Sequence, residues 1–234
     1  FREAGYLPQA IVNFMALLGW NPGGSREVFT LDELAEAFSL EKVQKAGAVF
    51  NVRRLDWFNA QYIRSMSVDE LVRHAVPFWV SAGFITEQGG EYRSSATGEA
   101  AGAGFLAAIV TLEQNRMKRL AEIAPLTEFF FVDVPEYDAA LLAWKGKGAE
   151  ETREALEAAA AVLEGISAED FTADQLSDKL LPVAAAHGDK GVILWPLRVA
   201  LTGREASPDP IAIAAILGKE KTMRRLRAAV EKLG

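Results

Sequence analysis

Arginine and lysine side chains near the C-terminus are the residues of this 234-residue sequence with the clearest capacity to bind a ligand. Residues 198–234 carry a net charge of +4, so the rest of the chain carries −11 of the total of −7. A guanidinium group is a rigid fork of donors that can bond a carboxylate, a carbonyl, a phosphate or a base edge. Arg198 is the clearest case, because apolar residues flank it and a buried arginine requires a partner. The ordinary alternative for the whole segment is a helix with a solvated basic face.

The residue types of common catalytic centres are absent or scattered. The sequence has no cysteine, which excludes disulfides, thiolate zinc sites, iron–sulfur clusters and cysteine nucleophiles. His74 and His187 are the two histidines and lie far apart along the chain. We find no glycine-rich phosphate loop, no G-x-S-x-G turn and no H-E-x-x-H helix. Acidic pairs such as Asp32 and Glu33 begin helices, where carboxylates favour the helix dipole, so an enzyme built on scattered carboxylates has little support.

The composition is that of a globular protein that does not span a membrane. Half of the residues are hydrophobic and 24% are charged, which excludes wholesale disorder. No apolar run approaches the roughly 20 residues of a membrane helix. The first residues hold a charge pair and no apolar stretch, so we expect no signal peptide. We expect a cytoplasmic protein with no membrane partner, since the lack of cysteine fits a reducing compartment.

Helix signals dominate and predict an all-α fold of two or three small helical units. Three Ser/Thr-x-x-Glu/Gln capping boxes begin at Thr30, Ser67 and Thr172. Further helical patterns start at Pro8 and cover 105–120, 150–164, 192–201, 211–217 and 222–233. Residues 87–104 are rich in Gly, Ser and Thr and predict a loop or hinge, and the short run 129–132 fits either a strand or a buried helix. We find no hairpin signal and no βαβ alternation.

Polar residues are embedded among core-like residues in the N-terminal third. Trp20, Trp57 and Tyr62 are typical anchors of a core. Asn13, Asn59 and Arg64 lie among them, so they either satisfy buried backbone groups or face a partner.

Three stretches in a fixed order, Gly5–Trp20, Phe50–Arg64 and Leu194–Glu220, resemble the C-terminal part of bacterial glutamyl-tRNA synthetases, a class I aminoacyl-tRNA synthetase family. The resemblance covers nearly the whole chain and is weakest in 87–104. The family's catalytic α/β domain carries HIGH and KMSKS-type sequences, and neither occurs here. The resemblance therefore implies a fragment that begins after the active site and is inactive alone. Its regions would be a stem-contact part (1–75) and two helical anticodon-binding parts (76–134 and 135–234).

The resemblance also implies roles for individual residues. Arg116 and Arg198 match arginines that contact anticodon bases, and Pro210 stands where the family can place a leucine that packs on an anticodon nucleotide. Single-stranded bases are read by hydrogen bonds to their edges and by stacking, and a guanidinium can supply both. The remaining cations would contact phosphates or the stem, with Trp57 beside Arg64 facing the inner side of the tRNA; they are Arg64, Lys118, Arg119, Arg204, Lys219, Arg224 and Arg225.

The function implied is the tRNA-recognition portion of a glutamate–tRNA ligase, which uses ATP to attach glutamate to its tRNA. The expected partner is the tRNA for glutamate and not DNA, and we expect a monomer. ATP and Mg would belong to the catalytic domain, with no cofactor in this portion. The alternative is a stand-alone helical module, derived from the same family, that binds protein or RNA. Whether the parent enzyme also charges glutamine tRNA is left open by the sequence.

Overall fold

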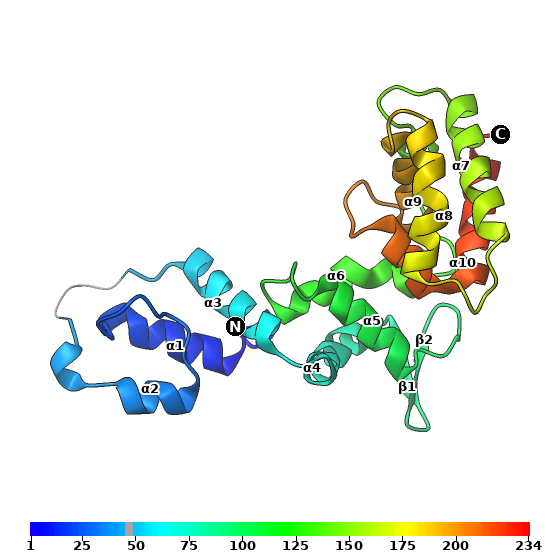
Figure 1. Ribbon diagram of the computed structural model, residues 1–234. Helices are drawn as coiled ribbons and strands as arrows, with labels where there is room; N and C mark the ends of the chain where they lie inside the picture. Colours follow the sequence, from blue (N-terminus) through cyan, green and yellow to red (C-terminus); the bar gives the residue numbers. More distant parts are fainter. Residues whose placement is uncertain (45–48) are drawn as a thin grey trace. The chain divides into compact units, whose positions relative to one another are not determined.

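The computed structural model describes residues 1–44 and 49–234, and within these ranges the chain is mainly helical (Figure 1). The helices are α1 (Pro8–Gly19), α2 (Leu31–Ala37), α3 (Val52–Ser65), α4 (Val68–Ser81), α5 (Ala103–Glu113), α6 (Ile123–Thr127), α7 (Ala149–Glu164), α8 (Ala173–Ala186), α9 (Gly191–Thr202) and α10 (Pro210–Lys232). Short 3₁₀ turns cover Leu40–Lys42, Leu120–Glu122, Glu128–Phe130 and Ala139–Leu142. The expected all-α class is confirmed, with one small hairpin as an exception.

The chain forms two compact units. Unit 1 contains residues 1–82 and 113–125, and unit 2 contains residues 83–112 and 126–234. The three consecutive regions expected from the sequence differ from this grouping, because residues 113–125 pack with the N-terminal part of the chain.

Local signals set the helix ends. Pro8 begins α1 at a position where its missing N–H costs nothing. The side chain of Thr30 accepts from the backbone N–H of Glu33, and Glu33 accepts from the N–H of Thr30, which completes the capping box of α2. Gly218 has φ 77° and ψ 166°, so α10 consists of two helical stretches, as the sequence predicts.

The hairpin in residues 85–94 corrects the sequence analysis, which expected a loop there. Strands β1 (Ile85–Gln88) and β2 (Glu91–Ser94) pair antiparallel, with Gln88 opposite Glu91. Gly89 and Gly90 have φ of 62° and 86°, the left-handed pair that a tight hairpin turn requires. The Gly-Gly dipeptide was a usable signal. The flanking strands gave no supporting pattern. Each strand has a single buried residue, Ile85 in β1 and Ser94 in β2, so apolar and polar residues do not alternate along them.

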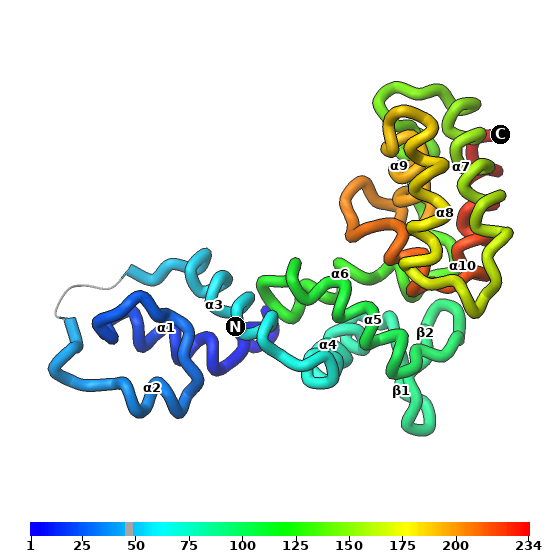
Figure 2. The backbone as a smooth tube through the Cα atoms, viewed as in Figure 1, coloured from blue at the N-terminus to red at the C-terminus, as the bar shows by residue number. Residues whose placement is uncertain are grey.

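Each unit has its own core. In unit 1, Phe14 of α1 packs with Leu55 and Phe58 of α3 and with Tyr6. In unit 2, helices α7, α8, α9 and α10 lie side by side, and the tube in Figure 2 follows the chain through them. Leu156, Leu197 and Leu226 are completely buried between these helices.

The two units differ in the apolar surface that they expose. Within the described ranges, every exposed Val, Leu, Met, Phe or Trp side chain belongs to residues 1–80. Met15, Leu40 and Trp57 are examples, with exposed fractions of 52%, 81% and 42%. Unit 2 buries or half-buries its large apolar residues. No helix of the described part is long and apolar enough to cross a membrane.

Candidate functional site

Arg198 lies on α9, half-buried, and supports the loop that follows this helix. Its Nη1 donates to the backbone oxygen of Ser207 at 2.6 Å, to the hydroxyl of Ser207 at 3.0 Å and to the backbone oxygen of Pro208 at 3.1 Å. The loop begins at Gly203, which ends α9 in a left-handed conformation. Arg198 therefore fixes the shape of the loop 203–209 by charge-assisted hydrogen bonds.

Arg204 and Pro210 occupy the two ends of that loop. The Nη2 of Arg204 lies 3.3 Å from a carboxylate oxygen of Glu128, and its guanidinium lies 5.4 Å from the ring centre of Phe129. Arg204 also lines a pocket of about 370 Å³. Pro210 is buried at the first position of α10. Unit 2 itself covers the Pro210 ring in this structure, and the expected packing of Pro210 on a nucleotide stays a prediction.

The basic run at the end of the chain is used mainly inside the protein. Arg225 has no exposed surface, and its guanidinium donates to the backbone oxygens of four residues, Phe129, Leu201, Val132 and Asp133. Burial lowers the pKa of Arg225 to about 10, which leaves it charged at neutral pH. In this structure the guanidinium of Arg225 is covered and bonded to these carbonyl groups, and its expected phosphate contact stays a prediction.

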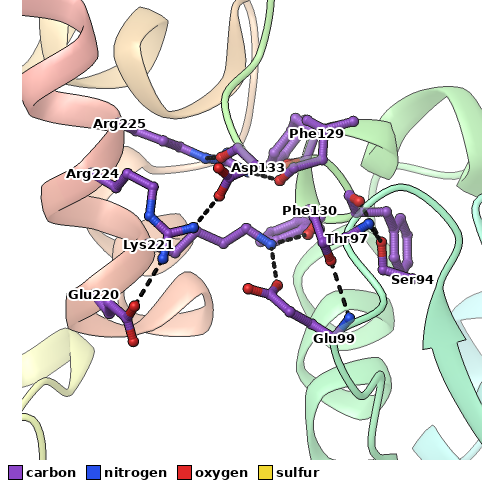
Figure 3. Close-up of polar contacts among 12 residues, drawn as sticks. Ser94, Thr97, Glu99, Phe129, Phe130, Asp133, Glu220, Lys221, Arg224 and Arg225 are labelled. Carbon is purple, nitrogen blue, oxygen red and sulfur yellow. Dashed lines mark hydrogen bonds and ion pairs between the residues drawn. The ribbon is translucent and has the colours of Figure 1, made fainter.

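Arg224 and Lys221 extend this network, which Figure 3 shows. Arg224 pairs with Asp133 and, at 2.8 Å, with Glu220. The ammonium of Lys221 is 2.8 Å from the carboxylate of Glu99, and its side chain is 11% exposed. A pocket of about 280 Å³ is lined by Phe130 and Phe131 together with the charged residues Glu99, Glu220, Lys221 and Arg224. Because the pocket holds charges of both signs, it is not a cationic groove.

Lys219 closes the end of a neighbouring helix. Its ammonium donates to the backbone oxygens of Glu164 at 2.8 Å and Ile166 at 2.7 Å. These oxygens lie at the C-terminal end of α7, where carbonyl groups have no partner within the helix. Binding of these oxygens accounts for a lysine at position 219 even in the absence of a ligand. A contact between Lys219 and a phosphate stays a prediction.

Arg116 belongs to unit 1 and is oriented by a buried acid. Its Nη1 lies 3.0 Å and 2.8 Å from the two carboxylate oxygens of Glu113, which is fully buried. The Arg116 side chain is 38% exposed. The other guanidinium nitrogens of Arg116 have no partner in the described part of the chain, so a fixed side chain presents free donors to solvent.

Three more of the expected cations lie in unit 1. The Nη2 of Arg64 lies 3.3 Å from the backbone oxygen of Asn115, at the limit of a hydrogen bond. Arg119 pairs with Glu122 at 3.0 Å, and this contact raises the pKa of Arg119. The ammonium of Lys118 is exposed and has no hydrogen-bond or ion-pair partner among residues 1–44 and 49–234. Lys118 is therefore an accessible candidate for a phosphate contact.

Several cations of the C-terminal segment are thus bonded within the protein, while unit 1 holds exposed cations of its own. Unit 1 also carries three cations that the sequence did not single out, Arg2, Arg53 and Arg73. Their side chains are exposed and have no ion pair within the described ranges. Neighbours in sequence could not have shown which cations are bonded within the protein, because several C-terminal cations find their partners far along the chain, as Arg224 does with Asp133 and Arg225 with the backbone oxygen of Phe129. Among the described residues, no group of three or more His, Asp or Glu side chains could hold a metal ion.

Comparison with known families agrees with the helical architecture. Residues 70–230 match the family described as "Anticodon binding domain". Residues 1–57 match the family "tRNA synthetases class I (E and Q), catalytic domain". The chain belongs to the family of anticodon binding domains. The second match assigns part of the region expected to contact the tRNA stem to the catalytic family.

Relatives of known sequence or structure extend the match to the whole chain. The glutamate–tRNA ligase of Desulforamulus reducens is 35% identical over 99% of this chain and 46% of its own length. That of Geobacillus stearothermophilus is 36% identical over 99% of this chain and 45% of its own length. A crystal structure of a glutamate tRNA ligase from Elizabethkingia meningosepticum is 29% identical, with a TM-score of 0.82, and covers 100% of this chain and 43% of that one. The chain therefore spans a little under half the length of the relatives it matches.

Proposed function

We propose that this chain is the tRNA-recognition portion of a glutamate–tRNA ligase. The observation that carries the proposal is the anticodon-binding match over residues 70–230, within a chain that aligns with glutamate–tRNA ligases over 99% of its length. The whole protein would attach glutamate to its tRNA at the expense of ATP. ATP and Mg would be bound by the catalytic domain. Residues 1–57 of this chain match the family of that domain.

The geometry supports separate tasks for the two candidate base-reading arginines. Arg116 has free donors on a guanidinium that Glu113 holds in place, and a bidentate contact to a base edge needs this kind of fixed fork. Arg198 donates from Nη1 to the backbone oxygens of Ser207 and Pro208. Arg198 would therefore contribute to RNA binding by holding the loop that it supports. Single-stranded bases would bind against this loop by hydrogen bonds and stacking.

A binding experiment with RNA tests the proposal. Fluorescence anisotropy would compare the glutamate tRNA with the same transcript carrying an altered anticodon, over a series of salt concentrations. We expect tighter binding of the matched tRNA and an affinity that falls with salt by a slope of about −0.7 per neutralised phosphate on single strands. Equal binding of both transcripts would refute anticodon recognition.

Two further measurements test the rest of the proposal. Sedimentation of the free chain would test whether it is a monomer. ATP–pyrophosphate exchange above background would contradict the absence of catalysis in this portion.

One observation favours the alternative of a protein-binding module. The exposed apolar side chains all lie in residues 1–80 of the described part, and such surface is typical of a contact with another protein domain. A partner held by this surface would show little dependence of affinity on salt. The salt series therefore separates the two functions.

A further inference from the structure

The buried carboxamide of Asn59 joins three segments of unit 1 that are far apart in the sequence. Its Oδ1 accepts from the backbone N–H of Leu7 at 2.8 Å. Its Nδ2 donates to the backbone oxygen of Gly5 at 3.3 Å and to that of Lys118 at 2.6 Å. The side chain has no exposed surface. Because a backbone N–H faces one end of the amide and two carbonyls face the other, its orientation is fixed by its partners.

The N-terminal segment and the segment around Lys118 are also joined by a backbone hydrogen bond. The N–H of Leu120 donates to the oxygen of Gly5 at 3.0 Å. Gly5 has φ 80°, and a Cβ at this position would lie 2.4 Å from the backbone nitrogen of Ala121. Only glycine allows this approach and this backbone angle. The N-terminal segment and residues 118–121 therefore pack main chain against main chain, with Asn59 beside the contact.

A second amide fastens the start of residues 113–125. The Nε2 of Gln114 lies 2.9 Å from the backbone oxygen of Ile63 and 3.0 Å from that of Met66. These oxygens lie at the C-terminal end of α3, where the Ile63 oxygen also accepts from the N–H of Met66 at 3.3 Å. The segment that carries Arg116 and Lys118 is thus fixed to α3 at both of its ends, by Gln114 and by Asn59.

We propose that Asn59 is a positioning residue for tRNA recognition, because it locks the Arg116–Lys118 segment onto Gly5–Leu7 and so holds the RNA-contacting side chains in place. The inference rests on the proposed function. Asn59 is inaccessible and touches no RNA. Its effect would pass through the backbone of residues 118–121, which Asn59 holds in one arrangement.

A change of one atom separates this role from simple packing. In Asn59→Asp, an oxygen replaces Nδ2, so the acceptor for Leu7 stays while the two donor bonds to Gly5 and Lys118 are lost. Asn13→Asp is the matched control. Asn13 is equally buried in unit 1 and donates to the oxygen of Glu27 at 2.9 Å. Its Oδ1 accepts from the N–H of Phe29 at 2.8 Å and from the hydroxyl of Tyr62 at 2.7 Å, and none of its hydrogen bonds joins residues 113–125.

The experiment measures the binding of matched and altered glutamate tRNA to the full chain and both variants. Circular dichroism and hydrogen exchange would be recorded in parallel. We expect Asn59→Asp to reduce the ratio of the two affinities about tenfold, a typical coupling between sites. We also expect faster exchange of the Leu120 amide, and Asn13→Asp should leave both unchanged. Equal loss of discrimination in both folded variants, or unaltered discrimination in Asn59→Asp, would overturn the role of Asn59.

Should Asn59→Asp fail to fold, Gln114→Leu tests the other end of the segment by the same ratio of affinities. An unchanged ratio in Gln114→Leu would count against the proposal. Failure of the unsubstituted chain to discriminate would instead refute the proposed function.

Discussion

The ammonium of Lys221 lies 2.8 Å from the carboxylate of Glu99, which joins helix α10 to the segment after the β1–β2 hairpin across 122 positions of sequence. The hydrogen bond from Lys221 holds the pKa of Glu99 below its usual value. A carboxyl group with a lowered folded-state pKa stabilises the fold above its unfolded pKa, and this stabilisation is lost as the pH falls through the folded value. The pair therefore makes the attachment of the hairpin sensitive to acid.

Glu99→Gln tests this pair. The substitution removes the carboxylate, so we expect a small loss of stability at pH 7 and a flatter dependence of stability on pH below about 4.5, the ordinary glutamate pKa. Urea denaturation between pH 7 and pH 3 would measure both. Identical pH profiles for the two proteins would show that Glu99 makes no contribution.

Arg225→Met should destabilise unit 2 by about 3 kcal/mol or more, since it leaves several buried carbonyl groups without donors. The matched control is Arg227→Met. Arg227 is two positions away, its side chain is 66% exposed, and its ion pair with Glu164 spans 3.5 Å. An exposed pair contributes less than about 1 kcal/mol. Thermal unfolding of both variants would compare them, and equal losses would contradict the buried network.

Tyr137→Phe should stabilise the protein by about 1 kcal/mol, because the buried hydroxyl of Tyr137 has no hydrogen-bond partner among the described residues. Burial also raises the pKa of Tyr137 to about 12. Tyr62→Phe is the contrast, since the Tyr62 hydroxyl lies 2.7 Å from Oδ1 of Asn13 and 2.5 Å from the oxygen of Phe29. Chemical denaturation should give opposite signs for the two variants.

Gly191→Ala should displace the indole of Trp144, because a Cβ at residue 191 would lie 2.3 Å from a ring atom of Trp144. We expect a loss of stability of about 1–3 kcal/mol from the overpacking and a shift in tryptophan emission. Gly104→Ala in α5 is the control. A Cβ at residue 104 meets nothing within 4 Å, and alanine there should be neutral or stabilising by up to about 1 kcal/mol.

Arg198→Ala should weaken binding of the glutamate tRNA by about 1–3 kcal/mol and reduce the difference between matched and altered anticodons. Arg224→Ala should weaken all tRNAs alike, because a phosphate contact carries no sequence information. The Arg224 side chain is 40% exposed and pairs with Glu220 and Asp133. Anisotropy titrations with both transcripts would measure the effects. Full discrimination by a folded Arg198→Ala variant would assign Arg198 to loop support alone.

Local signals predicted much of the fold. Pro8, the Thr30–Glu33 capping box and Gly218 each act within a few residues, so the sequence places these helix boundaries correctly. The return of residues 113–125 to unit 1 was not predictable, because it depends on hydrogen bonds from Asn59 and Gln114 over 48 positions or more. Long-range pairing of this kind leaves no periodic trace in the sequence.

The candidate site was harder to predict than the fold. Arg224, Arg225 and Arg227 look equivalent by composition, yet they are half-buried, buried and exposed. A helical stripe could have separated them: Thr222, Arg225, Leu226 and Ala229 recur at three- and four-residue steps and form the buried face of α10. Whether Arg116, Arg198 and the other accessible cations contact RNA stays a prediction.

The bond from Leu120 to Gly5 also constrains how the protein is made. During synthesis the N-terminus of the chain emerges from the ribosome first, and a domain usually folds once all of its residues have emerged. The segment that begins at Gly5 cannot reach its final packing until residue 120 has left the exit tunnel, since Asn59 needs both Gly5 and Lys118. Unit 1 is therefore completed only after the first strands and helix of unit 2 have been synthesised.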